Sequence, residues 1–149
     1  PVRSASEDRV TSGKYQFDEG DVLYSKLRPY LKKVSLAPFK GLCSADIYPL
    51  KINRTHLNPW FGVLLLLSDH FTDYAVGASQ RSRMPKLNRE QLFSWEVRLP
   101  TLEQQAQIVA KFEAIQSPIH SLTVEAKARL EAVEKLPAAL LREVFTASP

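Results

Sequence analysis

The sequence predicts an α+β fold, in which a small mixed domain over residues 1–100 is followed by a long coiled-coil-forming α-helix over residues 101–147. Before Pro100, short stretches of β-branched and aromatic residues alternate with turn residues, and all five glycines lie at or before Gly77. After Pro100 the chain is rich in Ala, Glu, Leu, Lys and Gln, which favour helices. At 149 residues, the chain has room for one cored domain with an extension.

Several elements are expected within the first part. Asn58 and Pro59 precede a run of apolar residues, as an N-cap and a first-turn proline precede a buried helix. A second short helix is expected to start near Asn88. Apolar and polar residues alternate from Trp95 to Leu99, which predicts a half-buried strand that closes the domain. Three further strands are expected at Asp21–Tyr24, Val34–Leu36 and Ile47–Ile52.

The second part has the spacing of a coiled-coil seam, with apolar residues in alternating steps of four and three. Arg129 interrupts the seam, as a local phase shift would. Pro118 and Pro137 predict kinks or short breaks. At about 1.5 Å per residue, the segment exceeds what a small domain needs for its own core, which favours pairing with another helix over folding back on the domain. The expected helix-pairing residues are Ile108, Phe112, Ile115, Ile119, Leu122, Ala126, Leu130, Val133 and Leu140.

Charge is distributed unevenly along the chain. The net charge is +4, with 15 Lys and Arg against 10 Asp and Glu in residues 1–100, and 5 against 6 in residues 101–149. A localised basic surplus is the electrostatic footprint of a phosphate-binding face, although many proteins without a polyanionic partner have a similar total.

Several classes of protein are disfavoured. Cys43 is the single cysteine, so no internal disulfide can form, and the start does not resemble a signal peptide, which predicts a cytoplasmic protein. The longest apolar run, Trp60–Leu67, is far shorter than the roughly 20 residues of a membrane span, so no membrane partner is expected. The sequence contains no glycine-rich phosphate loop, no HExxH motif, no paired-cysteine metal spacing and no nucleophile elbow. His56, His70 and His120 are scattered and lack metal-ligand neighbours, and Cys43 is expected to be buried and structural. We expect no catalytic residue and no metal site.

Two polar stretches combine cations with aromatic or amide side chains. The first suits a nucleic-acid surface, because lysine and arginine neutralise phosphates while tyrosine stacks or donates a hydrogen bond. The second contains the side chains that read base edges. The alternatives are a solvated strand edge for the first stretch and a flexible basic loop for the second. The predicted DNA-binding residues are Tyr24, Ser25, Lys26, Arg28, Tyr30, Lys32 and Lys33 in the first stretch, and Gln80, Arg81, Ser82, Arg83 and Lys86 in the second.

In their order and spacing, four segments resemble the specificity subunits of type I restriction-modification systems. Residues 20–31, GDVLYSKLRPYL, are similar to the central strand and loop of that family, and residues 41–50, GLCSADIYPL, to the next strand. The apolar helix and residues 77–87 follow in the same order. Leu99-Pro100-Thr101-Leu102-Glu103-Gln104-Gln105 resembles the Leu-Pro-Pro-Leu-Glu-Glu-Gln entry into the family's helix, with Thr101 and Gln104 as departures, and residues 140–145 resemble that helix's ending.

The resemblance implies a target-recognition domain that reads half of a split site in double-stranded DNA and is not itself an enzyme. In this family, antiparallel helices hold two such domains apart. Methyltransferase subunits clasp these helices and supply S-adenosylmethionine chemistry, and a motor-nuclease subunit supplies ATP hydrolysis and cleavage, with Mg expected there too. This chain is expected to bind no cofactor itself, and to pair through its helix with a second recognition half or as a homodimer.

Other interpretations remain open at this point. Recognition domains of the family usually have strands ahead of the Gly-Asp segment, so we expect residues 1–100 to be N-terminally incomplete, or the chain to be a half-length subunit. A fused restriction-methylation enzyme uses the same kind of domain. From a different class, the chain could be a coiled-coil scaffold whose front domain binds another protein and not DNA. An enzyme acting alone is the least favoured alternative.

Overall fold

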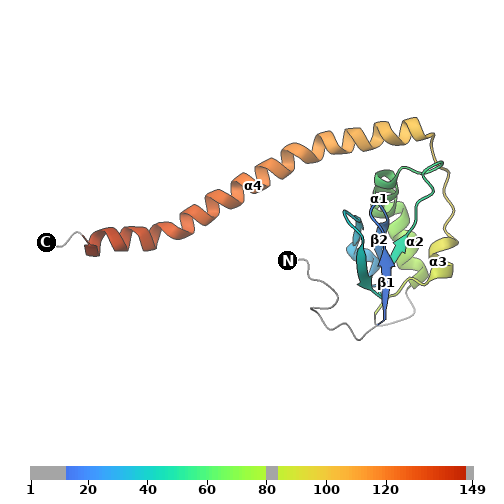
Figure 1. Ribbon diagram of the computed structural model, residues 1–149, viewed down its shortest axis with the longest axis horizontal. Helices are drawn as coiled ribbons and strands as arrows, with labels where there is room; N and C mark the ends of the chain where they lie inside the picture. Colours follow the sequence, from blue (N-terminus) through green and yellow to red (C-terminus); the bar gives the residue numbers. More distant parts are fainter. Residues whose placement is uncertain (1–12, 80–83, 147–149) are drawn as a thin grey trace. The chain divides into compact units, whose positions relative to one another are not determined.

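The computed structural model describes residues 13–79 and 84–146, and for residue 120 and residues 139–146 it describes the backbone alone. The chain divides into two compact units, residues 1–109 and residues 110–149 (Figure 1). The first unit contains the strands, three helices of the mixed domain and the first two turns of the long helix; the second contains the rest of that helix. The α+β class expected from the sequence is confirmed.

Within its described residues, the first unit contains two small antiparallel sheets. The larger has the order β3-β2-β5, with β2 (Val22–Ser25) between β3 (Val34–Leu36) and β5 (Ile47–Leu50). Tyr24 lies opposite Val34 on one side and Tyr48 on the other. The three predicted strands are therefore confirmed to within two residues at their ends. The smaller sheet pairs β1 (Lys14–Phe17) with β4 (Gly41–Ser44), and composition alone did not predict either strand.

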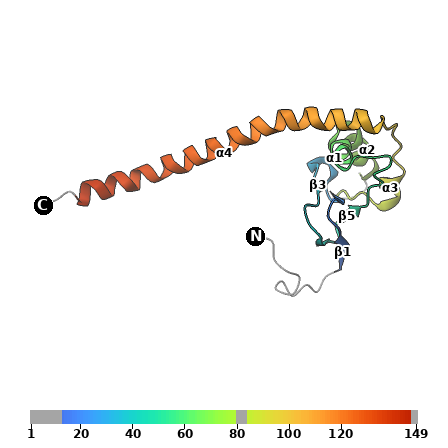
Figure 2. The same cartoon turned by 45° about the horizontal axis from the view of Figure 1, so that its top comes forward.

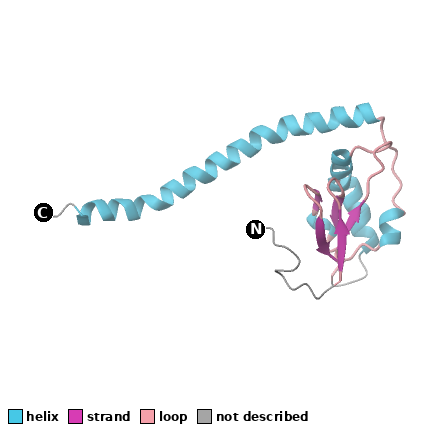
Figure 3. Cartoon of the chain, viewed as in Figure 1, coloured by secondary structure: helices cyan, strands magenta, loops and turns pink. Residues whose placement is uncertain are grey.

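Helices α1 (Pro59–Leu67) and α2 (Asp69–Ser79) lie beside the strands (Figures 2 and 3). Both helices contribute buried residues to the main core. Val22 and Tyr24 share one face of β2, because side chains alternate along a strand, and both are buried in this core. Phe71 lies edge-on to Tyr24, with ring centroids 5.5 Å apart, and edge-on to Trp95 at 4.8 Å. A second cluster of Phe17, Ala37 and Cys43 includes the predicted buried cysteine.

The predicted helix starts are present. Asn58 Oδ1 accepts the N–H groups of Trp60 and Phe61 at 2.9 and 3.3 Å, and Pro59 occupies the first turn of α1. Helix α3 (Arg89–Phe93) begins with a capping box in which Asn88 and Gln91 satisfy each other's backbone N–H groups. These local hydrogen bonds explain why both starts can be read from the sequence.

The strand predicted from Trp95 to Leu99 is wrong. These residues pair with no strand, and beyond Trp95 they are exposed as far as Leu99. Trp95 is half-buried because its ring packs on Phe71 and Tyr74. The alternation of apolar and polar residues in this segment therefore does not indicate a strand. It arises from one packed aromatic residue, Trp95, followed by an exposed connection that forms no strand pairing.

Helix α4 (Leu102–Thr146) begins where the change in composition predicts it. It runs through Pro118 and Pro137 without interruption, so the short breaks expected there are absent. A proline inside a helix removes one backbone hydrogen bond, while the neighbouring bonds of a long helix remain. No helix among the described residues is long and apolar enough to span a membrane.

The predicted seam is exposed in the single chain beyond the first unit. Ile115, Ile119, Leu122, Leu130 and Val133 are each more than half exposed. Arg129, at the interruption, forms an ion pair with Glu125 one turn earlier. The side chain of Leu140 lies outside the described residues. Pairing through this seam stays a prediction.

Candidate nucleic-acid interface

Residues 26–28 of the first polar stretch and residues 85–87, at the end of the second, lie side by side in the structure. Leu27 and Lys86 form an isolated antiparallel bridge. On either side of it, the N–H of Arg28 donates to the carbonyl of Pro85 at 2.9 Å, and the N–H of Leu87 donates to the carbonyl of Lys26 at 3.0 Å. The chain that leaves β2 is therefore held against the chain that leads into α3.

A tight turn follows this bridge. Pro29–Leu31 form the short 3-10 helix η1, flanked by Arg28 at φ 52° and Lys32 at φ 47°. They are the non-glycine residues with positive φ among those the structure describes. Such backbone costs about 1–3 kcal/mol and persists where its surroundings impose it, often at binding loops. Pro29 is buried, whereas Tyr30, at 51% exposure, and Leu31 face outward.

Lys32 fixes the turn to the helical layer. Its Nζ donates to Oδ1 of Asp69, the first residue of α2, and forms an ion pair with it. This hydrogen bond and the charge of Lys32 hold the pKa of the Asp69 carboxyl below its usual value. Lys32 is therefore largely committed to structure. The neighbouring Lys33 is exposed and its carbonyl accepts the N–H of Ser25 at 3.0 Å.

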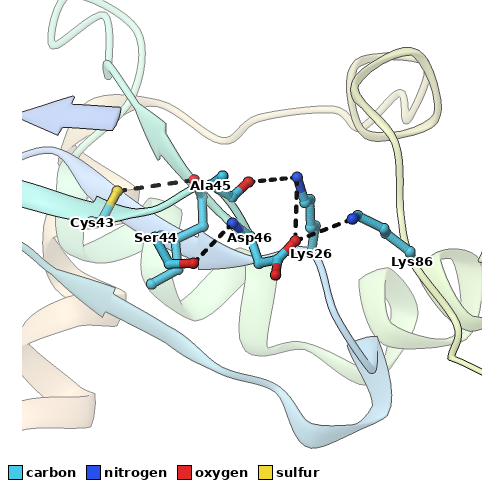
Figure 4. Close-up of polar contacts among 7 residues, drawn as sticks. Lys26, Cys43, Ser44, Ala45, Asp46 and Lys86 are labelled. Atoms are coloured by element: carbon cyan, nitrogen blue, oxygen red, sulfur yellow. Dashed lines mark hydrogen bonds and ion pairs between the residues drawn. The ribbon is translucent and has the colours of Figure 1, made fainter. Parts of the chain in front are cut away.

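A carboxylate lies between lysines from the two stretches (Figure 4). Asp46 Oδ1 is 3.1 Å from Nζ of Lys86 and 3.5 Å from Nζ of Lys26. Lys26 also donates to the carbonyl of Ala45, and its Nζ lies 5.2 Å from the centroid of the Tyr48 ring. Lys86, and to a lesser extent Lys26, hold the pKa of Asp46 below its usual value. The carboxylate thus neutralises part of the local positive charge.

Not every predicted DNA-facing residue faces outward. Tyr24 is 2% exposed and belongs to the main core, so its prediction as a DNA contact is wrong. Burial also raises the pKa of Tyr24 to about 12. Ser25 is half-buried, and the side chain of Lys26 is only 11% exposed and directed towards Ala45, Asp46 and Tyr48. The predicted residues Gln80, Arg81, Ser82 and Arg83 lie outside the described residues.

The predicted residues that remain accessible define a surface that we call the basic turn, which consists of Arg28, Tyr30, Lys33 and Lys86. Arg89, which the sequence analysis did not select, lies near it. Its guanidinium carbon is 5.6 Å from the ring centroids of both Tyr15 and Tyr48. The sequence does show that Arg89 follows the predicted helix cap Asn88, so its place at the start of α3 could be predicted. Its nearness to the aromatic rings of β1 and β5 requires the fold.

The remaining candidates for chemistry do not gather into a site. Among residues 13–79 and 84–146, no group of three or more His, Cys, Asp or Glu side chains is arranged to hold a metal ion. Burial raises the pKa of the Cys43 thiol, whose Sγ donates to the carbonyl of Ile47 at 4.0 Å. His70 packs near Trp95, with ring centroids 5.7 Å apart. The basic turn is therefore a surface of cationic and aromatic side chains, which suits the binding of a polyanion and not catalysis.

The sequence model of the type I restriction modification DNA specificity domain matches residues 4–132. The chain belongs to this family. It is 38% identical over 141 residues to the specificity subunit of the type I restriction enzyme EcoDI from Escherichia coli, covering 93% of this chain and 31% of that protein.

Solved structures of the family share the fold. The HsdS subunit from Thermoanaerobacter tengcongensis matches with a TM-score of 0.61 and 30% identity, over 83% of this chain and 32% of that one. A chain from a structure concerned with complex assembly and conformational transition of the type I restriction-modification system matches with a TM-score of 0.63 and 27% identity, over 89% of this chain and 34% of that one. This chain therefore spans about a third of the length of these relatives.

Proposed function

We propose that this chain recognises DNA sequence as the specificity subunit, or half of it, of a type I restriction-modification enzyme, and carries out no reaction of its own. Family membership supports this role, because the matching domain is a DNA specificity domain. The structural observation that supports it is the bridge between Leu27 and Lys86, which brings Lys86 beside the first polar stretch.

The basic turn has the chemistry that duplex DNA requires. Lysine ammonium groups, as on Lys33 and Lys86, neutralise phosphates without regard to sequence. A guanidinium such as that of Arg28 can bind the O6 and N7 atoms of guanine together. Tyr30 offers an exposed ring and a hydroxyl at the tip of the turn. The buried Pro29 and the Lys32–Asp69 ion pair help to position the turn that carries Arg28, Tyr30 and Lys33.

Helix α4 supplies the interaction with other subunits in this proposal. Its exposed seam would pair with the helix of a second recognition half or a second copy of the chain. Methyltransferase subunits would bind this helical region and, through them, the motor-nuclease subunit would join the complex in the cytoplasm. S-adenosylmethionine, ATP and Mg would be bound by those partners, with none held by this chain.

A titration of duplex DNA tests the proposal against a scaffold that does not bind DNA. The chain, alone and with its methyltransferase partners, is titrated with a labelled duplex at salt concentrations from about 50 to 200 mM. A reader that contacts several phosphates loses affinity steeply across this range, because each contact releases counterions. Absence of binding under all of these conditions, or an affinity that does not change with salt, would contradict the proposal.

A further inference from the structure

Gln105, near the start of α4, is a buried polar residue whose side chain joins separate segments of the first unit. It is 0% exposed. Its Oε1 accepts the N–H of Asn58 at 2.8 Å, and its Nε2 donates to the carbonyls of His56 at 3.0 Å and Pro100 at 2.8 Å. Both amide hydrogens are used, and a flipped amide would place donors against the Asn58 N–H. The network therefore admits one orientation of the side chain.

The start of the helix is fixed around this residue. The N–H of Thr101 donates to Oε1 of Gln104 at 3.0 Å, and the N–H of Gln104 donates to Oγ1 of Thr101 at 3.3 Å, which forms a capping box. The backbone N–H of Gln105 donates to the carbonyl of Thr101 at 2.9 Å. Val109, one turn later, is also buried. The first two turns of α4 therefore belong to the same compact unit as the strands.

A buried amide holds these turns in a way that an apolar side chain does not. Apolar contact is favourable but has no direction, so it tolerates small rotations and shifts. Hydrogen bonds to three backbone groups are directional, and leaving those groups unpaired in a buried place is unfavourable. Gln105 thus restricts both the rotation and the translation of the helix start relative to His56 and Asn58.

Because α4 is long, a small change in orientation at its start produces a large movement at its far end. Helix α4 has 45 residues, and a helix of that length measures about 68 Å. A tilt of about 3° at the base of such a helix moves its far end by about 3.5 Å, close to the rise of about 3.4 Å per base pair of DNA. This movement is sideways, because the same tilt changes the reach along the helix axis by only about 0.1 Å. A small loosening at the base would therefore displace a second recognition half at the far end, relative to this domain, by about the rise of one base pair.

We propose that Gln105 is a positioning residue for recognition of a split DNA site, and that it determines how sharply the spacing between the two half-sites is read. The inference rests on the proposed function, because spacing matters only when α4 joins this domain to a second recognition half or copy. Gln105 contacts no DNA in this role. It acts through the first two turns of α4.

Two substitutions separate the parts of the network. Gln105→Met keeps the length and burial of the side chain but removes all three hydrogen bonds. Gln105→Glu keeps an acceptor for the Asn58 N–H but removes both donors. Leu92→Ala is the matched control, because Leu92 is buried in the main core and lies outside this network. It lowers the stability of the domain without altering the helix base.

Amide hydrogen exchange tests the network without DNA. In Gln105→Met, the Asn58 amide should exchange at least about tenfold faster than in the wild type, while the Tyr24 amide of β2 changes less. Leu92→Ala should speed both amides to a similar degree. If Gln105→Met leaves exchange at Asn58 unchanged, the network does not hold the helix base and the inference is overturned. If this variant does not fold, Gln105→Glu is carried into the binding assay.

A binding assay with different spacer lengths measures a property that a merely structural role of Gln105 would not change. The chain, assembled with its methyltransferase partners and second recognition half, is tested on duplexes that carry its selected site with the spacer changed by one to three base pairs. Wild type should lose at least about tenfold in affinity for a one-base-pair change, because two linked halves bind together only when the geometry permits it. The Gln105 variants should lose less than about threefold, and Leu92→Ala should keep the wild-type profile.

The outcomes separate the two claims. If the wild type and the Gln105 variants distinguish the spacings equally well, the role of Gln105 is overturned and the proposed function stays in place. Wild type that binds no duplex would overturn both claims. Wild type that binds its selected site equally well at all spacings would overturn the role of Gln105 and leave sequence recognition by this domain in place. A flattened profile in the Gln105 variants alone supports the inference.

Discussion

Replacing Lys33 with alanine should weaken binding to every duplex by a similar factor and reduce the dependence of binding on salt. Lys33 is an exposed residue of the basic turn, and within the part of the chain that the structure describes it forms no ion pair. Loss of one phosphate contact lowers the slope of log affinity against log salt by about 0.9. Between about 50 and 200 mM salt, that amounts to about a 3.5-fold smaller loss of affinity than in the wild type.

Two other lysines make the comparison specific. Lys32→Ala removes a charge that Asp69 already neutralises, so it should change the slope less than Lys33→Ala does. Lys40 forms an ion pair with Asp18 in another part of the domain, and Lys40→Ala removes the same formal charge as the control. Fluorescence anisotropy with one specific and one unrelated duplex measures all three variants. Equal slopes for Lys33→Ala and Lys40→Ala would refute the assignment of phosphate binding to the basic turn.

Three further predictions follow from the same contacts. Phe71 is 1% exposed, so Phe71→Ala should lower the free energy of unfolding by about 3–5 kcal/mol in urea titration; a loss below about 1 kcal/mol would contradict its place in the core. Asp46→Asn should raise affinity for all duplexes alike by freeing Lys86; unchanged or lower affinity would exclude this competition. Lys51 lowers the pKa of Asp18, so Asp18→Asn should reduce the free energy of unfolding at pH 7. The difference from wild type should disappear as the pH falls below 3.8, the usual pKa of an aspartate, and through the lowered pKa of Asp18; a difference that persists at lower pH would argue against this ion pair.

Local signals predicted much of the fold. Asn58, Pro59 and Asn88 marked helix starts because the caps form between residues close in sequence. Thr101 and Gln104 provide the same kind of local signal. They depart from the family's usual residues, yet together they form a capping box at the start of α4. A Thr followed three residues later by Gln is sufficient to predict this contact.

Elements that depend on distant partners were harder to predict. Strands β1 and β4 pair with each other across more than twenty residues, and each has only four residues. Pairing partners and buried faces are tertiary properties, and residue preferences alone do not specify them.

The candidate interface shows the same division between local and distant information. The sequence identified both polar stretches, but not the contact between Leu27 and Lys86 that joins them. Side-chain alternation in β2 places Tyr24 on the same face as Val22, so its burial could have been inferred from the apolar character of that face. The inward direction of Lys26 depends on Asp46 and Ala45 from the β4–β5 turn, and only the fold brings them to it.

Selection from a library of random duplexes would test whether this domain reads DNA sequence. The chain, assembled with its methyltransferase partners and second recognition half, is used to enrich bound duplexes over several rounds at a fixed salt concentration. Our account predicts enrichment of a split motif, and Arg28→Ala should relax the preference at one position of the half-site that this domain reads. Duplexes that are retained without any enriched sequence would show that the basic turn binds phosphates alone, and would contradict a role in sequence recognition.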